Sequence, residues 1–302
     1  MLNKAINLRK FFLIIQLFMK KLLVIICSIF VVSSAALSDS TKVTYKTKTT
    51  IFQDVGRDLG IFATDWGSYL ISPVRMNGKD IFITTSVIQG TLISSTADKE
   101  VRRKISRQGF DTYNKDFWDA PTFYGYVQYP SILGGAMYAA GLFTRNDWIR
   151  ITGRELIQAL VYGGTLTMGI RYVLGRHRPY TSNNDQYEFE WFTSDGELQA
   201  FPSGHMVVAI TTSTILAERI NKWWARAILY PMALLTGYAR IYNDKHWLSD
   251  VIFGAALGYG SAKFVLNQEE RREKEAKKKT KNKSGGFNLI PTGNGLHFTY
   301  SF

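Results

Sequence analysis

Three arginines, Arg171, Arg176 and Arg178, stand close together where a long apolar run ends at Gly175. Arginine presents a planar fork of N–H donors that matches the oxygens of a phosphate group. Arg171 and Arg178 are seven residues apart, so they lie on nearly the same side if a helical path continues between them. A solvated basic helix end, favoured by the helix dipole, would have the same composition. The cluster alone leaves both interpretations open.

A second cluster consists of Pro202, Ser203, Gly204 and His205, directly before an apolar run. Ser203 is a natural helix N-cap, and Gly204 lets a ligand approach the backbone closely. Amides at a helix N-terminus bind anions, and a histidine placed there can donate a proton to an ester oxygen. The alternative is an ordinary capped helix start that carries a surface histidine.

The third cluster contains Arg240, His246 and Asp250. His246 and Asp250 are four residues apart, so on a helix the carboxylate reaches one imidazole nitrogen and leaves the other free. This arrangement orients a histidine that acts as a nucleophile or general base. A local His–Asp pair that stabilises a helix start would look the same.

Taken together, the clusters favour chemistry on a phosphate group. Two of the four histidines, His205 and His246, fall beside arginines or an anion-binding turn, whereas His177 between two arginines has a structural role and His297 in the tail has none. We find no acidic cluster at metal-ligand spacing, and the single cysteine, Cys27, cannot form a disulfide or a cysteine metal site. We therefore predict no metal site and no cofactor.

The elements that must position these residues are helices. Between residues 54 and 266, apolar runs are separated by Gly, Pro and Asn, with Pro130 and Gly204 at helix starts and Gly175 at a helix end. No alternating strand series and no internal repeat is found, so we predict an all-α helical bundle. The expected helices are 54–69, 79–95, 99–109, 130–143, 147–174, 204–220, 223–240 and 246–266.

Several of these helices are short for a membrane span, and others carry internal charges such as Arg154 and Glu155. A soluble or peripherally attached domain is therefore favoured, although 248–266 has charges only near its ends. The formal net charge of +13 is concentrated at the ends. Residues 1–36 contribute five charges and 268–283 another four, which leaves four for the remainder. We expect no nucleic-acid partner.

The N-terminus has the order of an export signal. Residues 22–32 are apolar, follow two lysines and precede small residues, so we predict a signal peptide over 1–36 with a true start at Met19. An uncleaved anchor over 11–32 is the alternative. Export places the protein in the periplasm or cell envelope, at or near a membrane.

In this order, the three clusters resemble the signature of the type 2 phosphatidic acid phosphatase superfamily, which includes bacterial acid phosphatases and vanadium haloperoxidases. Arg171 stands in the place of the family's first lysine, and Arg178-Pro179 and the Pro-Ser-Gly-His of 202–205 match. Arg240, His246 and Asp250 match the third motif, with Ala239 in its serine place. The motif residues span 171–250, and the helical region around them extends the likeness to about 100–266.

The resemblance implies the helical bundle of this superfamily and a role for each matched residue. His246 would attack phosphorus to form a phosphohistidine, Asp250 would hold its tautomer, and His205 would protonate the leaving oxygen. The phosphate oxygens would be bound by Arg171, Arg178, Arg240, Ser203 and Gly204. The resemblance covers a phosphatase core over 100–266. From the sequence pattern we expect a helical lead-in over 37–99 before it, and a charged linker over 267–286 and a strand-like tail over 287–302 after it.

The predicted substrate is a phosphate monoester or diphosphate, preferably of a lipid. Aromatic residues before the core, such as Phe123 and Tyr126, could line a lipid entrance, although core packing explains them equally well. Alternatives are a vanadium haloperoxidase, in which vanadate is a cofactor rather than an inhibitor, a lipid phosphotransferase, and a non-catalytic anion- or lipid-binding envelope protein. Nothing in the sequence indicates the oligomeric state.

Overall fold

The computed structural model describes residues 49–106, 120–284, 287–292 and 295–300. The predicted signal peptide over 1–36, with Cys27, lies outside the described residues and stays a prediction.

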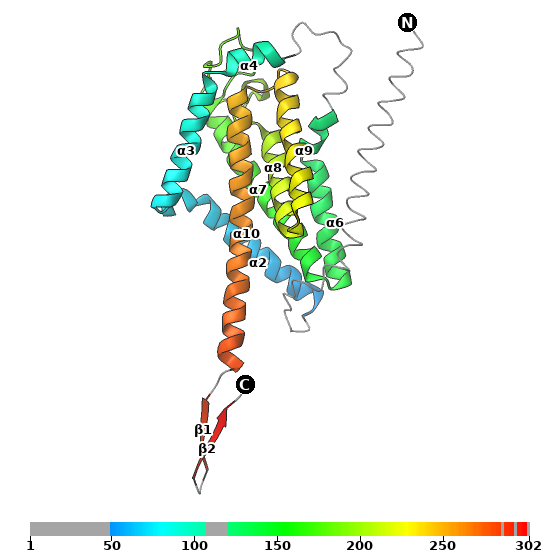
Figure 1. The fold of residues 1–302 in the computed structure, drawn as a ribbon, viewed down its shortest axis with the longest axis vertical. Coiled ribbons are helices and arrows are strands. Elements are labelled where there is room, and N and C mark those ends of the chain that lie inside the picture. Colours follow the sequence, from blue (N-terminus) through cyan, green and yellow to red (C-terminus); the bar gives the residue numbers. More distant parts are fainter. Residues whose placement is uncertain (1–48, 107–119, 285–286, 293–294, 301–302) are drawn as a thin grey trace, which may run out of the picture.

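A bundle of long helices forms the body of the molecule (Figure 1). Helix α8 is its centre, because it contacts α7, α9 and α10, while α6 packs on α7. Most of the α8 side chains are buried, which its sequence of small, apolar and hydroxyl residues allows. The bundle helices are α6 (Gln128–Thr144), α7 (Asp147–Leu174), α8 (Gly204–Ile220), α9 (Trp223–Tyr242) and α10 (Leu248–Ser284).

Three further helices precede the bundle. Helix α2 (Ile51–Leu70) crosses it, α3 (Gly78–Ser95) packs on α10, and α4 (Asp98–Ile105) lies across one end against α9 and α10. Short 3-10 segments are η1 (Ser72–Arg75), η3 (Ala120–Gly125) and η4 (Gly196–Leu198). Near the C-terminus, β1 (Phe287–Thr292) pairs antiparallel with β2 (Gly295–Tyr300).

Local sequence explains where the helices begin and end. Thr50 forms a capping box with Gln53 at the start of α2, and the Asn146 side chain accepts the Ile149 amide at the start of α7. Helix α7 ends at Gly175, whose φ of 52° is left-handed. A Cβ at Gly175 would also overlap the carbonyl oxygen of Glu190, so only glycine fits here.

Each predicted helix has a counterpart, which confirms the all-α bundle, although several bounds differ from the predicted ones. The predicted linker over 267–286 is instead helical to Ser284, because its first turns pack against α2 and α7. Helix α10 begins at Leu248 rather than at 246, since the Asp250 carboxylate accepts the Trp247 amide just before the helix. The predicted boundary between residues 99 and 100 falls inside α4.

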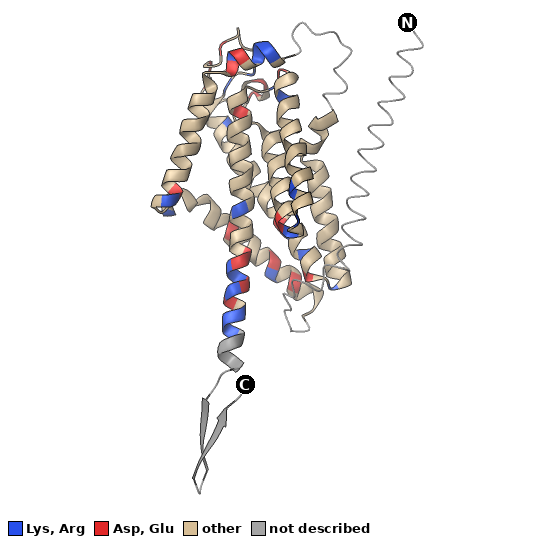
Figure 2. Ribbon diagram, in the orientation of Figure 1, with Lys and Arg blue, Asp and Glu red and all other residues tan. Residues whose placement is uncertain are grey.

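Charged residues concentrate toward the two ends of the molecule (Figure 2). At one end, four buried residues form what we call the interhelical ion cluster. Arg154 of α7 donates to Asp58 of α2 at 2.6 Å and to Glu269 of α10 at 2.5 Å, and Arg150 also pairs with Asp58. Each of the four side chains is at most 5% exposed, so each charge needs an opposite charge beside it. These ion pairs join three helices.

None of the described helices has both the length and the apolar content needed to cross a membrane.

We predict that Arg154→Met destabilises the protein by about 3–5 kcal/mol, because it removes the arginine that Asp58 and Glu269 share and leaves two buried carboxylates with one buried arginine in the cluster. The midpoint of chemical denaturation measures this change. Lys274→Gln is the control, since Lys274 forms only an exposed pair with Glu270 and its loss should leave the midpoint unchanged. Equal midpoints for Arg154→Met and the wild type would contradict the structural role of the cluster.

Candidate active site

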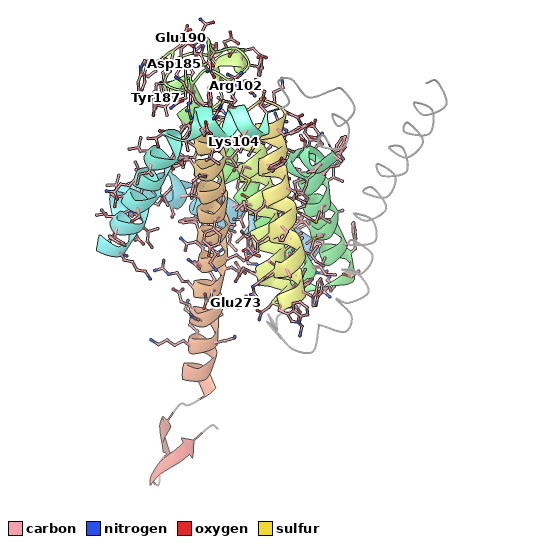
Figure 3. The ribbon with its side chains drawn as sticks, turned by 45° about the horizontal axis from the view of Figure 1, so that its top comes forward. Arg102, Lys104, Asp185, Tyr187, Glu190 and Glu273 are labelled. Atoms are coloured by element: carbon pink, nitrogen blue, oxygen red, sulfur yellow. The ribbon has the colours of Figure 1, made fainter. Side chains whose placement is uncertain are left out.

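The three sequence clusters meet at the end of the bundle that α4 covers. The first lies where α7 ends, the second begins α8, and the third lies in the turn between α9 and α10. Figure 3 shows α4, with Arg102 and Lys104, beside the loop that carries Asp185 and Tyr187, whereas Glu273 lies toward the other end of α10.

Backbone hydrogen bonds connect the clusters directly. The Ala200 amide donates to the Arg176 carbonyl at 2.9 Å, and the Ser203 amide donates to the Asp250 carbonyl at 3.0 Å. The indole Nε1 of Trp247 donates to the His177 carbonyl at 3.0 Å. Residues far apart in the chain are thus held in one unit.

His246 is buried, at 2% exposed, and its ring is oriented through Nδ1. Nδ1 lies 2.8 Å from the Ala200 carbonyl oxygen and 3.5 Å from Oδ2 of Asp250. A carbonyl oxygen can only accept, so Nδ1 carries the proton and Nε2 holds the free lone pair. The nearer partner is therefore the carbonyl, whereas the sequence led us to expect the Asp250 carboxylate.

Asp250 is fully buried and accepts two other hydrogen bonds. Its Oδ1 accepts from Arg176 at 2.6 Å, and its Oδ2 accepts from the Trp247 amide at 2.8 Å. Burial raises the pKa of Asp250, and Arg176 opposes that shift by stabilising the carboxylate. Because both oxygens face N–H donors, the carboxylate form fits this site.

Arg171 lies against the turn that begins α8. Its Nε and one terminal nitrogen donate to the Pro202 carbonyl at 3.0 and 2.8 Å. A Cβ on Gly204 would come within 3.0 Å of the same guanidinium, a tight contact that the end of the Arg171 side chain would have to move to relieve. Burial and the nearby charge of Arg178 lower the pKa of Arg171 to about 10.

The start of α8 directs polar groups into the site. Ser203 holds the N-cap position, yet its side chain makes no capping bond, and its buried Oγ has no partner among the described residues. The same holds for Nε2 of His205, whose ring contacts the edge of Tyr126 with 5.2 Å between centroids. Together with the first amides of α8, these groups can bind an anion.

Burial and surrounding positive charge lower the pKa values of both histidines. Burial lowers the pKa of His205 to about 2, helped by Arg240, His246, Arg171 and Arg178. The pKa of His246 is likewise well below its usual range, first through burial and then through the same three arginines. All three arginines predicted to bind phosphate thus act electrostatically on both histidines.

Other residues predicted from the sequence take lesser places. Arg178 donates to the Gly196 carbonyl at 3.1 Å and Arg240 is buried near the histidines. The His177 ring faces Glu188 at 3.6 Å, away from these hydrogen bonds. His297 lies in β2. The chemical roles remain predictions.

Sequence reasoning missed three partners of the site. The Ala200 carbonyl and the Trp247 amide are backbone groups that carry no side-chain signal. Arg176 was grouped with the other arginines, but it binds Asp250 and also Asp98 of α4 at 2.8 Å. In the described residues, no group of three or more His, Cys, Asp or Glu is placed to hold a metal ion.

Comparison with known proteins identifies relatives of the region that carries the site. A family model described as the PAP2 superfamily matches residues 153–274. An undecaprenyl-diphosphatase of Sulfolobus acidocaldarius is 33% identical over 118 residues, which cover 39% of this chain and 53% of that protein. A lipid A 1-phosphatase of Porphyromonas gingivalis is 31% identical over 116 residues, or 37% of this chain and 22% of that protein. The match thus spans well under two thirds of either relative.

A comparison with solved structures matches a transmembrane PAP2 type phosphatidylglycerolphosphate phosphatase from Bacillus subtilis, with a TM-score of 0.48 and 19% identity. The match covers 62% of this chain and 96% of that one.

We predict that neither His205 nor His246 titrates between pH 5 and 8 in the protein without an anion. An ordinary histidine would be roughly 97% protonated at pH 5, whereas a lowered pKa keeps these two neutral. NMR of 15N-labelled histidines, assigned with His205→Gln and His246→Gln, measures this directly. A resonance of either histidine that titrates near pH 6.5 would contradict the buried, positively charged site.

Proposed function

We propose, from the premise that residues 153–274 of this chain form a PAP2 superfamily domain, that the protein is a phosphatase acting through a phosphohistidine. One observation carries the proposal: the charges of three arginines act on two buried, neutral imidazoles. Three arginine charges gathered around two histidines favour the binding of an anion, and arginine matches phosphate. Two histidines supply the nucleophile and the acid that phosphoryl transfer requires.

In the first step, His246 attacks the phosphorus. The Ala200 carbonyl holds Nδ1–H, so the Nε2 lone pair forms the N–P bond. The bond from phosphorus to the leaving oxygen breaks at the same time, and its electron pair stays on that oxygen. His205 gives this oxygen a proton, which yields an alcohol or, from a diphosphate, a phosphate product.

His205 must be protonated to act as this acid, although its pKa without an anion is about 2. A bound phosphate ester brings negative charge among Arg171, Arg178 and Arg240, which offsets the repulsion that now disfavours the imidazolium. Substrate binding and proton uptake by His205 are therefore coupled.

The arginines stabilise the charge on the non-bridging phosphate oxygens, and Ser203 Oγ and the Gly204 amide add hydrogen bonds. Arg171 donates two hydrogen bonds to the Pro202 carbonyl, which hold the guanidinium in place. Its other N–H groups can therefore bind the phosphate. Positioning and electrostatics of this kind supply most of what phosphoryl transfer requires, so we propose that the reaction needs no metal ion or other cofactor.

In the second step, a water molecule replaces the leaving group. His205, now neutral, removes a proton from this water, whose oxygen attacks phosphorus as the N–P bond breaks. Phosphate leaves and His246 regains its lone pair. An alcohol in place of water would give phosphotransfer, which product analysis with added glycerol distinguishes.

We propose a lipid phosphate or diphosphate as the substrate. The two curated relatives carry names that refer to lipid A and to undecaprenyl diphosphate. In this chain, Phe123, Tyr126 and Tyr129 form a ring cluster, and Tyr126 contacts His205, where the leaving group would lie. A protein acting on lipids works at a membrane surface, in keeping with the predicted export to the cell envelope. Both relatives are phosphatases by name, so the haloperoxidase alternative gains no support from them.

We predict that His246→Ala lowers kcat on a chromogenic phosphate ester at least about 1,000-fold, because the nucleophile is lost. A labelled phosphoenzyme, trapped by denaturation in alkali, should form in the wild type and be absent from this variant. His177→Gln is the matched histidine control and should retain both signals. Undiminished hydrolysis by His246→Ala would reject the mechanism, and no hydrolysis by the wild type would favour a non-catalytic anion-binding protein.

We predict that the purified full-length protein hydrolyses lipid phosphates and diphosphates in detergent micelles with a higher kcat/KM than soluble phosphate esters. EDTA should leave these rates unchanged, and vanadate should inhibit competitively as a phosphate mimic. Release of inorganic phosphate measures all of these effects. A marked preference for soluble esters would overturn the lipid assignment, and loss of activity in EDTA that added metal restores would overturn metal independence.

A further inference from the structure

Helix α4 precedes the matched region 153–274, yet two of its buried side chains reach the segment that carries His246. Arg102 binds both carboxylate oxygens of Asp244, at 2.8 and 2.7 Å. Asp98 binds Ser249, which lies on the other side of His246 in the chain. Helix α4 therefore holds the turn on both sides of the proposed nucleophile, as its place across this end of the bundle allows (Figure 3).

Asp98 is fully buried and all of its hydrogen bonds point toward the site. Oδ1 accepts the Ser249 amide at 2.9 Å, and Oδ2 accepts the Ser249 hydroxyl at 2.6 Å and Arg176 at 2.8 Å. Burial raises the pKa of Asp98, and Ser249 and Arg176 oppose that shift. Because each oxygen faces a donor, the carboxylate form fits this place and fixes the first turn of α10.

Arg176 bridges Asp98 and Asp250. One terminal nitrogen donates to Asp250 at 2.6 Å and to the Ser249 hydroxyl at 2.7 Å, while the other donates to Asp98 and to the Gln186 carbonyl. The guanidinium lies over the Trp247 ring, 5.6 Å from its centroid. At 3% exposed, it is held away from solvent.

The charges explain why two carboxylates are needed. Arg176 paired with Asp250 alone would be neutral and would leave no negative charge beside His246. With Asp98 added, the group carries a net charge of −1. Attack through Nε2 makes the imidazole ring cationic while Nδ1 keeps its proton, and Asp250 lies 3.5 Å from that nitrogen. A net negative group at this place stabilises the cationic ring as it forms.

We propose that Asp98 and Arg176 are positioning residues for the nucleophile: Asp98 offsets the charge of Arg176, so that Asp250 remains effectively negative toward His246. This inference rests on the proposed phosphohistidine mechanism. The assignment adds a residue of α4, outside the family match, to the machinery that acts on His246.

The test uses the full-length protein and p-nitrophenyl phosphate in rapid-mixing experiments, where the burst of p-nitrophenol reports phosphorylation of His246. We expect Asp98→Asn to lower the burst rate constant about 10- to 100-fold, with a KM within about twofold of the wild type and an unchanged burst amplitude per folded protein. Arg103→Gln, on the exposed face of α4, is the control and should match the wild type.

A double variant separates charge from packing. Asp98→Asn with Arg176→Gln removes one charge of each sign and restores the net charge of −1, so it should be faster than Asp98→Asn alone. A double variant slower than the single one, or a lower amplitude with an unchanged rate constant, would show that Asp98 only supports folding and would overturn the proposal.

If Asp98→Asn does not fold, the double variant is compared directly with the wild type, since this group carries a net charge of −1 in both. A burst rate constant within several-fold of the wild type supports the proposal, and one lowered by more than about 10-fold overturns it. The proposed function fails separately: a burst, or undiminished steady-state hydrolysis, that persists in His246→Ala rejects the phosphohistidine itself.

Discussion

The site depends on one buried interaction, the bridge that Arg176 makes between Asp98 and Asp250. Three charges at most 3% exposed are stable only when each is paired and hydrogen-bonded. Satisfying them requires α4, the Gln186 carbonyl and the first turn of α10 to be in place together. The backbone around His246 is therefore fixed by the same contacts that make burial of these charges tolerable.

The arginines near the site divide into two kinds. Arg176 is matched by two carboxylates, and its net effect is to hold the structure together. Arg171, Arg178 and Arg240 instead lower the pKa of both histidines through their positive charge. In the proposed mechanism a bound phosphate ester offsets this charge, so the same arginines favour phosphate binding.

At the opposite end of the bundle, buried charges are also paired with charges of the opposite sign. In the interhelical ion cluster, Arg150 and Arg154 are balanced by Asp58 and Glu269, and the result joins α2, α7 and α10. Since α7 and α10 also carry residues of the candidate site at their other ends, the cluster fixes the register of the helices on which the site is built. Glu269 also explains why the charged run after residue 266 continues as packed helix rather than as a linker.

Much of the fold and of the site follows from the sequence. Apolar periodicity and residues such as Gly175 and Gly204 predicted every bundle helix, because these signals act within one or two turns of the chain. The residue types of the three clusters likewise indicated phosphate chemistry and named His205, His246 and Asp250, since their chemistry is a property of the side chains themselves.

Only the tertiary structure decided how those residues work together. It showed that the Ala200 carbonyl is the nearer partner of His246, that Arg176 differs from its neighbouring arginines, and that Asp98 belongs to the site. Spacing along the chain could not reveal these contacts, because they join residues 46, 74 and 78 positions apart or involve backbone groups common to every residue. The sequence determined which chemical groups are present, and the packing of α4, α7, α8 and α10 determined which of them meet.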